Sequence, residues 1–221
     1  MDGTENAIGD NGKTFLFGLL EHAFPELVGQ TDPRVLEEDY SSKSHKCLKQ
    51  MIGKRLIYAD EGTKNKVNSS LIKKIGDGLK IENEVLFGYT EIIDIQFKLF
   101  VCSNHLPKIG KDEDAVFNRY KQIQMCSHFD RSGCREAEVY EKLEFIADPK
   151  LSDKLVKDCL DEIIYLVLDF ATRYYRQGIP PVPIEFLQAS ANTKLKNNDF
   201  AVWFWNNFEK GSGNLALDEI M

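Results

Sequence analysis

The chain has 221 residues, of which 43% are hydrophobic, with 28 basic and 35 acidic side chains and a formal net charge of −7 at pH 7. This length supports one substantial core and a small second module. The acidic balance argues against a protein that coats nucleic acid with a basic face, and no apolar stretch approaches the roughly 20 residues of a membrane helix. The five cysteines lack paired spacing, which indicates reduced thiols and a cytoplasmic location.

A glycine-rich turn near the start of the chain runs directly into an apolar helical pattern. The turn reads Gly9-Asp10-Asn11-Gly12-Lys13-Thr14-Phe15, and a helix is expected from Lys13 to Phe24. Glycines let backbone N–H groups converge on phosphate oxygens, and the helix N-terminus adds partial positive charge. Lys13 would contact the β and γ phosphates, and the Thr14 hydroxyl would bind Mg²⁺. The alternative is a polar loop that only starts a helix.

The turn departs from the usual phosphate-loop pattern at its first position. The pattern G-x-x-x-x-G-K-[ST] would place a glycine where the chain has Ala7. Either the loop has ordinary geometry at Ala7, or Gly3 starts an enlarged loop. Residues 1–6 contain no apolar run that could form a strand before the loop. We therefore expect the first strand of the sheet to be missing and the chain to be a fragment or a short gene product.

A buried strand ending in two carboxylates is the next motif. It follows a predicted short strand near Glu26–Gly29 and a predicted helix over Ser44–Ile52. The apolar run from Arg55 to Ala59 reads as the strand, and Asp60 and Glu61 follow it. Asp60 can hold the Mg²⁺ shell, and Glu61 can polarise a water molecule. A strand that simply closes in a charged turn is the alternative.

A short helix and a β-hairpin come next in the chain. The helix is expected over Val67–Ile75, and the hairpin is formed by Ile81–Tyr89 and Glu91–Ile95. Local basic charge can oppose the acidic sign of the whole chain, so the lysines near this hairpin are candidate DNA contacts. They are Lys73, Lys74 and Lys80. A solvated helix face and a strand end are the alternative interpretation.

A third apolar run, Phe97–Ser103, reads as another buried strand and delivers Asn104 to its end. Ligands of open α/β sheets lie beyond the carboxyl ends of parallel strands. Asp60, Glu61 and Asn104 would therefore converge on the phosphates held by Lys13. Asn104 could hydrogen-bond the γ-phosphate or the attacking water, or it could only form a turn before the following proline. The core is expected to close near residues 120–125.

The pattern becomes helical from Arg135 onward. Val139, Leu143 and Ile146 are spaced for one helix face, and a long helix is predicted from Lys150 to Gln177, where Gly178 stops it. The aromatic residues of this helix are expected to pack against the protein rather than to stack on bases. They are Phe170, Tyr174 and Tyr175.

Two further helices are expected at Ile184–Ala191 and Asp199–Phe208, and Leu215–Met221 looks like the first part of another element. Trp203 and Trp205 cannot both face one core, so one of them would serve an interface. A zinc site is also conceivable, although a fourth ligand is not evident in its spacing. Its three ligands would be Cys126, His128 and Cys134.

In order and spacing these motifs resemble the superfamily 3 helicases of the AAA+ class, specifically the poxvirus-type primase-helicases of large DNA viruses and phages. Residues 9 to 125 carry the likeness most densely, and the helical segments at 163–178 and 198–204 are similar to the region that follows the motor core. The matching motifs are Asn11-Gly12-Lys13-Thr14, the Walker B end Asp60-Glu61, the segment Lys73–Gly78, the sensor 1 segment Ser103–Pro107 and the arginine-finger segment Asp114–Arg119.

The resemblance implies an α/β fold with a P-loop NTPase core sheet flanked by helices. The ATPase core would occupy residues 1–127, a helical region 128–183, and the truncated start of a C-terminal helical or winged-helix module 184–221. Upstream primase and helical segments would be absent. Two departures from the family stand out, because Asn118 replaces the first of two arginines and Glu84 lies in the hairpin where a basic residue is common.

The resemblance further implies an ATP-dependent helicase motor that uses ATP and Mg²⁺ and moves on DNA held in a central channel of a homohexamer. Lys13, Glu61 and Asn104 would act on the ATP of their own subunit, and Arg119 on that of a neighbour. The protein would work in the host cytoplasm or at a viral replication site. The alternative is an inactive or truncated nucleotide-binding remnant that acts as an interaction protein. A small-molecule kinase would need an arginine-rich lid, which is not visible in the sequence.

Overall fold

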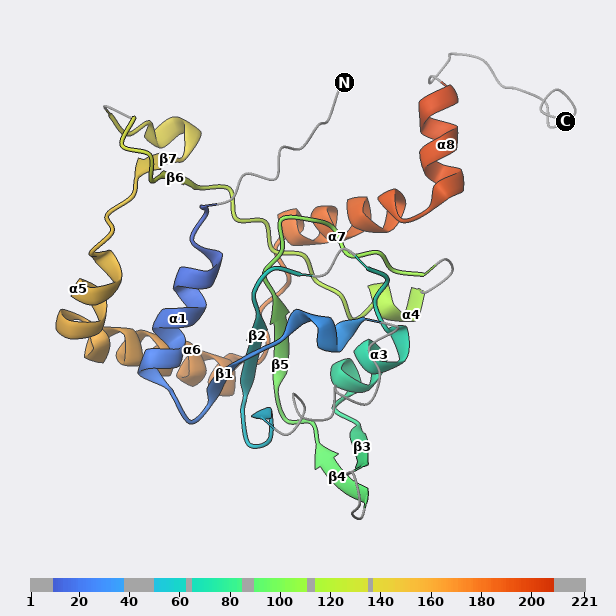
Figure 1. Ribbon diagram of the computed structural model, residues 1–221, viewed down its shortest axis with the longest axis horizontal. Helices are drawn as coiled ribbons and strands as arrows, with labels where there is room; N and C mark the ends of the chain where they lie inside the picture. Colours follow the sequence, from blue (N-terminus) through green and yellow to red (C-terminus); the bar gives the residue numbers. More distant parts are fainter. Residues whose placement is uncertain are drawn as a thin grey trace, which may run out of the picture.

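The computed structural model describes residues 10–37, 50–62, 65–84, 90–110, 114–134 and 137–208. Within these ranges a parallel sheet with the strand order β1-β2-β5 lies at the centre (Figure 1). Its strands are β1 (Val28–Thr31), β2 (Leu56–Ala59) and β5 (Lys98–Val101). The expected α/β class with a parallel sheet is therefore confirmed.

The register of the sheet decides which side chains share a face. Ile57 pairs with Leu99, and Tyr58 pairs with Phe100. Because successive side chains of a strand point to opposite faces, Tyr58 and Phe100 lie together on one face. Helix α1 (Lys13–Ala23) covers that face. The ring of Phe17 stacks on Tyr58 with centroids 5.3 Å apart and lies 5.2 Å from the ring of Phe100.

The opposite face of the sheet holds the main hydrophobic core. Helix α3 (Ser69–Asp77) packs there together with the antiparallel hairpin of β3 (Lys80–Glu84) and β4 (Thr90–Asp94). The core residues come from β2, α3, the hairpin and the 3₁₀ helix η1 (Pro33–Leu36), and from the connections before β2 and between β4 and β5. They are Val35, Leu36, Met51, Ile57, Ile75, Ile81, Ile93, Ile95 and Phe97.

The second half of the described chain is mostly helical and lies around α1 and the sheet (Figure 1). Helices α5 (Leu151–Asp158) and α6 (Leu160–Gln177) both contact α1. The parallel pair β6 (His128–Asp130) and β7 (Glu144–Ile146) lies above them in this view. The remaining helices are α4 (Asp114–Phe117), α7 (Ile184–Lys196) and α8 (Asp199–Asn207), the last projecting away from the sheet.

The prediction of a helix through Val139, Leu143 and Ile146 is wrong. The structure has a 3₁₀ helix η2 (Tyr140–Lys142), a left-handed residue at Leu143 with φ 55°, and then strand β7. Pairing of β7 with β6 brings the rings of Phe145 and Phe129 to 5.4 Å between centroids. Such pairing joins distant residues, and local helical spacing carries no signal for it.

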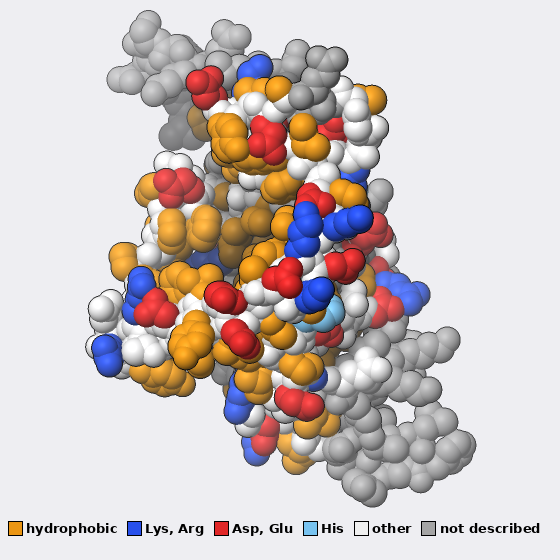
Figure 2. Space-filling view, turned by 90° about the vertical axis from the view of Figure 1, so that its left-hand side faces the viewer, with side chains coloured by type: hydrophobic (Ala, Val, Ile, Leu, Met, Phe, Trp, Pro, Cys, Tyr) orange, Lys and Arg blue, Asp and Glu red, His pale blue; other side chains and the backbone are white. Residues whose placement is uncertain are grey.

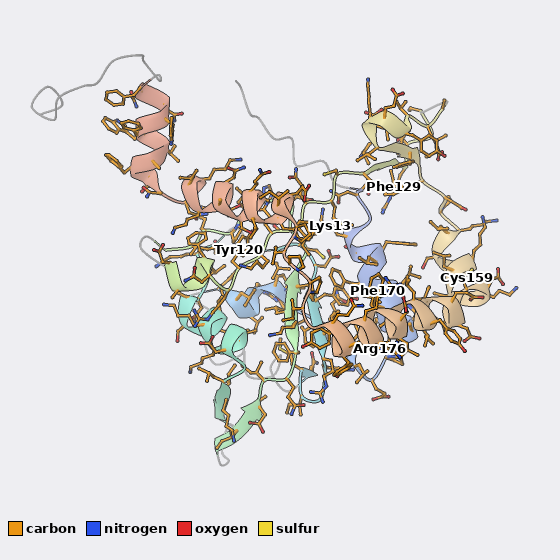
Figure 3. The ribbon with its side chains drawn as sticks, turned by 180° about the vertical axis from the view of Figure 1, so that it is seen from behind. Lys13, Tyr120, Phe129, Cys159, Phe170 and Arg176 are labelled. Carbon is orange, nitrogen blue, oxygen red and sulfur yellow. The ribbon has the colours of Figure 1, made fainter. Side chains whose placement is uncertain are left out.

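The prediction of a single long helix from Lys150 to Gln177 is also wrong, because α5 and α6 are separate helices. The break is at Cys159, whose φ is −132° (Figure 3). No glycine or proline marks it. The break lets two consecutive helices contact α1, so a tertiary requirement overrides a continuous helical pattern.

The α6 aromatics are not packed as expected. Phe170, Tyr174 and Tyr175 are 58%, 50% and 85% exposed. Both tryptophans of α8, Trp203 and Trp205, are exposed too. Figure 2 shows that hydrophobic side chains are abundant on the side of the molecule that carries α5 and α6. Over the described ranges, no helix is long and apolar enough to cross a membrane.

The other predicted elements are found with shifts of a few residues at their ends. The helices at 13–24, 67–75, 184–191 and 199–208 and the three strands of the sheet are confirmed. The expected burial of the third strand is wrong, because β5 is exposed at Lys98 and Val101 and half-buried between them. Most of the helix predicted at Ser44–Ile52 lies outside the described residues. The same is true of the element predicted at Leu215–Met221.

Candidate functional site

The phosphate-loop motif forms a tight turn at the start of α1. Gly12 is the residue before the helix, with φ 79°, in the left-handed region that favours glycine. Asp10, at φ 58°, also adopts this region. The Asn11 side chain donates to the Met125 carbonyl at 3.2 Å and so ties the turn to a distant segment. Gly9, like Ala7 and Gly3, lies outside the described residues.

Lys13 and Thr14 of this turn meet the ends of the two neighbouring strands. The Lys13 ammonium donates to Asn104 Oδ1 at 2.9 Å, beyond β5, and also to Asn11 Oδ1. The Thr14 hydroxyl donates to Asp60 Oδ1 at 2.8 Å, beyond β2. The structure thus brings together Lys13, Thr14, Asp60 and Asn104, although Lys13 and Asn104 are 91 positions apart in the sequence. Phe15 follows in the first turn of α1.

Glu61 directly follows Asp60 and has a strained backbone. Its φ is 56°, and its backbone N–H donates to Asp60 Oδ1 at 3.2 Å. The next residue, Gly62, donates to the Cys102 carbonyl at 2.7 Å. A Cβ on Gly62 would lie only 2.6 Å from the Cβ of Ser103. The Gly62 backbone, in the turn after β2, therefore packs against the Ser103 side chain, in the turn after β5. This contact fixes the position of Glu61 relative to Asn104.

Oxygen ligands for a metal ion lie where α1 begins and β2 ends. Mg²⁺ is usually bound by one or two carboxylates, with phosphate and water oxygens completing its shell. The Thr14 hydroxyl and the Asp60 carboxylate fit that requirement. No group of three or more His, Cys, Asp or Glu side chains suited to a metal is found in the described part of the chain, and the cysteines and histidine of the conceivable zinc site form none.

Sequence reasoning missed Cys102, the first residue after β5. Its thiol is 4% exposed. Burial, together with the nearby Asp60 carboxylate, raises the pKa of Cys102 to about 11, while Lys13 lowers it. The position of Cys102 at the end of an apolar run was the available signal.

Sequence reasoning also missed the contact of β6 and Arg131 with the loop before α1. The Phe129 backbone N–H donates to the Asp10 carbonyl at 2.8 Å, which aligns β6 with the turn. Arg131 forms an ion pair with the Asp10 carboxylate at 3.0 Å. In Figure 3, Lys13 and Phe129 lie at the same end of α1. Nothing in the local pattern around Arg131 predicts this contact, because it depends on where β6 lies.

Arg119, the arginine-finger candidate, is engaged within its own chain. Its guanidinium donates to both carboxylate oxygens of Asp77, at 2.7 and 2.8 Å, and to the Ala115 carbonyl at 2.6 Å. A Cβ on Gly76 would lie 2.7 Å from the Arg119 Cδ, so the arginine stem rests on this glycine. The Arg119 guanidinium lowers the pKa of Asp77 below its usual value of 3.8. Arg119 therefore clamps α4 to the end of α3.

The three lysines proposed as DNA contacts lie at α3 and the hairpin. Lys74 is exposed near the C-terminal end of α3, and Lys73 is half-buried on the same helix. Lys80 begins β3 and faces Asp94 across the hairpin with an N···O distance of 3.4 Å. Exposed pairs of this kind are weak, so Lys80 stays available to another partner.

A cavity of about 360 Å³ adjoins Asp60 on the β1 side of the site. Thr31 lines it, and the Thr31 hydroxyl is buried with no hydrogen-bond partner. The Asp32 carboxylate, also in the lining, is held by Arg34, which lowers its pKa. The cavity is therefore polar and continuous with the carboxylate that is the candidate metal ligand.

No protein family model matches the chain. The chain is 30% identical over 178 residues to a protein of Acanthamoeba polyphaga mimivirus named "Putative helicase L207/L206". The alignment covers 77% of this chain and 18% of that viral protein. The chain thus spans less than a fifth of its relative's length. The chain is therefore similar in sequence to one part of a viral protein that is named a putative helicase.

Proposed function

We propose that this chain is the ATP-dependent motor of a viral-type replicative helicase related to superfamily 3 of the AAA+ class. The observation that carries the proposal is the contact of Lys13 with Asn104 at 2.9 Å beside the contact of Thr14 with Asp60 at 2.8 Å. A cationic donor, a hydroxyl, a carboxylate and an amide thus lie in two contacts made by consecutive residues at the N-terminus of α1. That combination suits a nucleoside triphosphate with its metal.

In this function each residue of the site has one role. Gly12 and the backbone N–H groups of α1 cradle the phosphates, and Lys13 balances the charge of the β and γ phosphates. Thr14 and Asp60 would hold Mg²⁺, which supplies charge neutralisation at the phosphates when bound. Glu61 orients the attacking water, and Asn104 hydrogen-bonds the γ-phosphate or that water.

The proposal extends to assembly and substrate. Arg119 would act on ATP bound by the neighbouring subunit of a homohexamer, with DNA in a central channel contacted by Lys73, Lys74 and Lys80. The proposed regions are the ATPase core at 1–127, the helical region at 128–183 and a C-terminal module starting at 184. Location in the host cytoplasm or at a viral replication site follows from the same function.

A second candidate is a nucleotide-binding remnant that does not turn over. The ion pair of Arg119 with Asp77 favours it, because in this structure the arginine is engaged within its own chain. The two candidates share the phosphate site and differ in catalysis.

ATPase measurements with and without single-stranded DNA separate the two. The motor predicts DNA-stimulated turnover that is lost in Lys13→Ala and in Arg119→Ala but kept in Lys157→Ala, a lysine exposed on α5. ATP binding without turnover in the wild-type chain would support the remnant. If the wild-type chain does not bind ATP, or if Lys13→Ala binds it equally well, both candidates are wrong.

A further inference from the structure

The phosphate loop carries a negative charge of its own. Asp10 lies two residues before Gly12, and its carboxylate would repel a bound polyphosphate. In the structure this carboxylate is paired with Arg131, with Nε 3.0 Å from Oδ1. The Arg131 side chain is 73% exposed and the Asp10 side chain 41% exposed. An arginine from a distant segment thus lies at the loop in an accessible position.

Three contacts fix the segment that carries this arginine. Asn11 donates to the Met125 carbonyl, and the Phe129 N–H donates to the Asp10 carbonyl. The Phe129 ring approaches to 3.6 Å from where a Cβ on Gly12 would stand. The Arg131 side chain, one residue beyond the end of β6, in turn reaches the Asp10 carboxylate. Phe129 and Arg131 therefore both face the phosphate loop.

We propose that Arg131 is a phosphate-contacting residue for nucleotide bound in its own subunit, an inference that rests on the proposed function. On binding, the Arg131 guanidinium exchanges the Asp10 carboxylate for a phosphate oxygen of the nucleotide. An ion pair as exposed as this one is weakened by solvent, whereas phosphate offers higher charge and oxygen pairs that match the guanidinium fork. Arg131 complements Lys13 in cis, and Asp10 holds it in position until the phosphates arrive.

The experiment measures ATP and ADP affinity by titration calorimetry on the full chain. The variants are Arg131→Ala, Asp10→Ala, the double variant, Arg131→Lys and Lys13→Ala. Arg176→Ala is the matched control, because Arg176 is an exposed arginine near the C-terminal end of α6 (Figure 3). Arg131→Lys keeps the charge and loses the fork, which guards against a loss of fold in the alanine variant.

Arg131→Ala is expected to weaken ATP binding by about 10- to 100-fold, the range of a charged hydrogen bond, and Arg131→Lys by less. Arg176→Ala should bind as the wild type does. Asp10→Ala should tighten binding, because the competing carboxylate is gone. The weakening by Arg131→Ala should persist when Asp10 is already alanine.

A purely neutralising role for Arg131 gives a different pattern. In that case the effect of Arg131→Ala disappears in the Asp10→Ala background, and this result overturns the inference. Wild-type ATP binding that depends on Lys13 but not on Arg131 also overturns it and leaves the proposed function intact. Absence of Lys13-dependent ATP binding defeats the proposed function as well.

Discussion

Gly62 shows how one residue without a side chain couples two strand ends. It stands after the Asp60-Glu61 pair and lies against Ser103, just before Asn104. The carboxylates and the amide of the site belong to neighbouring strands, so their spacing depends on how closely the two turns approach. Only glycine permits this approach. Gly62, which has no side chain, therefore maintains the geometry of the site.

Gly62→Ala is expected to lower the free energy of unfolding by about 1–3 kcal/mol, because the new Cβ would overlap Ser103. Urea denaturation followed by circular dichroism measures the change. Gly18→Ala is the control, since a Cβ on this α1 residue meets nothing within 4 Å and alanine favours a helix by up to about 1 kcal/mol. Equal stability of both variants would refute the steric argument.

Cys102 makes the free energy of unfolding fall as the pH rises into the alkaline range. Burial raises the pKa of its thiol from 9.0 to about 11, so the unfolded chain loses this proton at a lower pH than the folded one. The thiol's contribution to stability is complete below pH 9 and is lost as the pH rises from 9 through 11. The loss amounts to at most about 1.4 kcal/mol per pH unit.

Cys102→Ala should flatten the fall in unfolding free energy between pH 9 and 11, measured by urea denaturation at fixed pH steps. Cys134→Ala, an exposed cysteine, is the matched control and should leave the slope unchanged. An unaltered slope in Cys102→Ala would show that this thiol titrates as it does in the unfolded chain.

Helix α7 acts at the scale of elements, because it fastens the segment that follows Asn104. Asn197 accepts from the Ile109 N–H at 3.0 Å, and Ser190 accepts from the Gln122 N–H at 3.0 Å. Lys194 pairs with Asp114 at 2.6 Å. The segment between Asn104 and Gln122, which includes α4, is thus held at three points along one helix.

Thr193 lies at the centre of this attachment. It is 1% exposed, and its hydroxyl contacts both Gln122 Oε1 and the Ala189 carbonyl. Thr193→Val should cost about 1–3 kcal/mol, because the buried Thr193 hydroxyl is lost and the half-buried Gln122 oxygen keeps only the 3.5 Å contact with the Tyr120 hydroxyl. Thr172→Val is the control, since the Thr172 hydroxyl makes the same contact to a carbonyl four residues back, at 2.8 Å, on an exposed face of α6.

Hydrogen exchange followed by mass spectrometry gives the element-level outcome. Amides of residues 109–124 should exchange faster in Thr193→Val, whereas Thr172→Val should leave them unchanged and cost less than about 0.5 kcal/mol. Faster exchange spread evenly over the whole chain would mean that α7 stabilises the fold without controlling this loop.

At the scale of the whole molecule, two partners compete for Arg119, namely Asp77 of its own chain and, in the proposed hexamer, ATP bound by a neighbour. The arginine can stay on its own α3 or, in the proposed hexamer, reach ATP on a neighbour. Mixing Lys13→Ala with Arg119→Ala subunits tests the second position. Some interfaces of the mixture then combine an intact Lys13 with an intact Arg119 from the adjacent subunit.

The mixture should show DNA-stimulated ATPase activity well above the sum of the two variants measured separately. Steady-state phosphate release at several mixing ratios is the measurement, and mixing each variant with the doubly substituted chain is the control. Activity equal to that sum would exclude action of Arg119 across an interface and favour the nucleotide-binding remnant.

Much of the N-terminal half of the fold could be predicted from local patterns. Apolar runs such as Arg55–Ala59 become buried strands because both faces of a parallel strand are covered, and a polar residue at the end of such a run falls at the sheet edge. That reasoning anticipated the positions of Asp60 and Asn104. It failed for β7 and for the break at Cys159, where contacts with β6 and α1 decide the backbone.

The sequence by itself determined the order of the motifs, the alternation of strands and helices, and which polar residues stand at strand ends. These features depend on neighbours within a few positions, so local chemistry is sufficient. Only the tertiary structure decided that Arg119 rests on Asp77, that Gly62 touches Ser103 and that Arg131 meets Asp10. Each of these contacts joins segments more than 40 residues apart, and packing of whole elements, rather than any local pattern, brings them together.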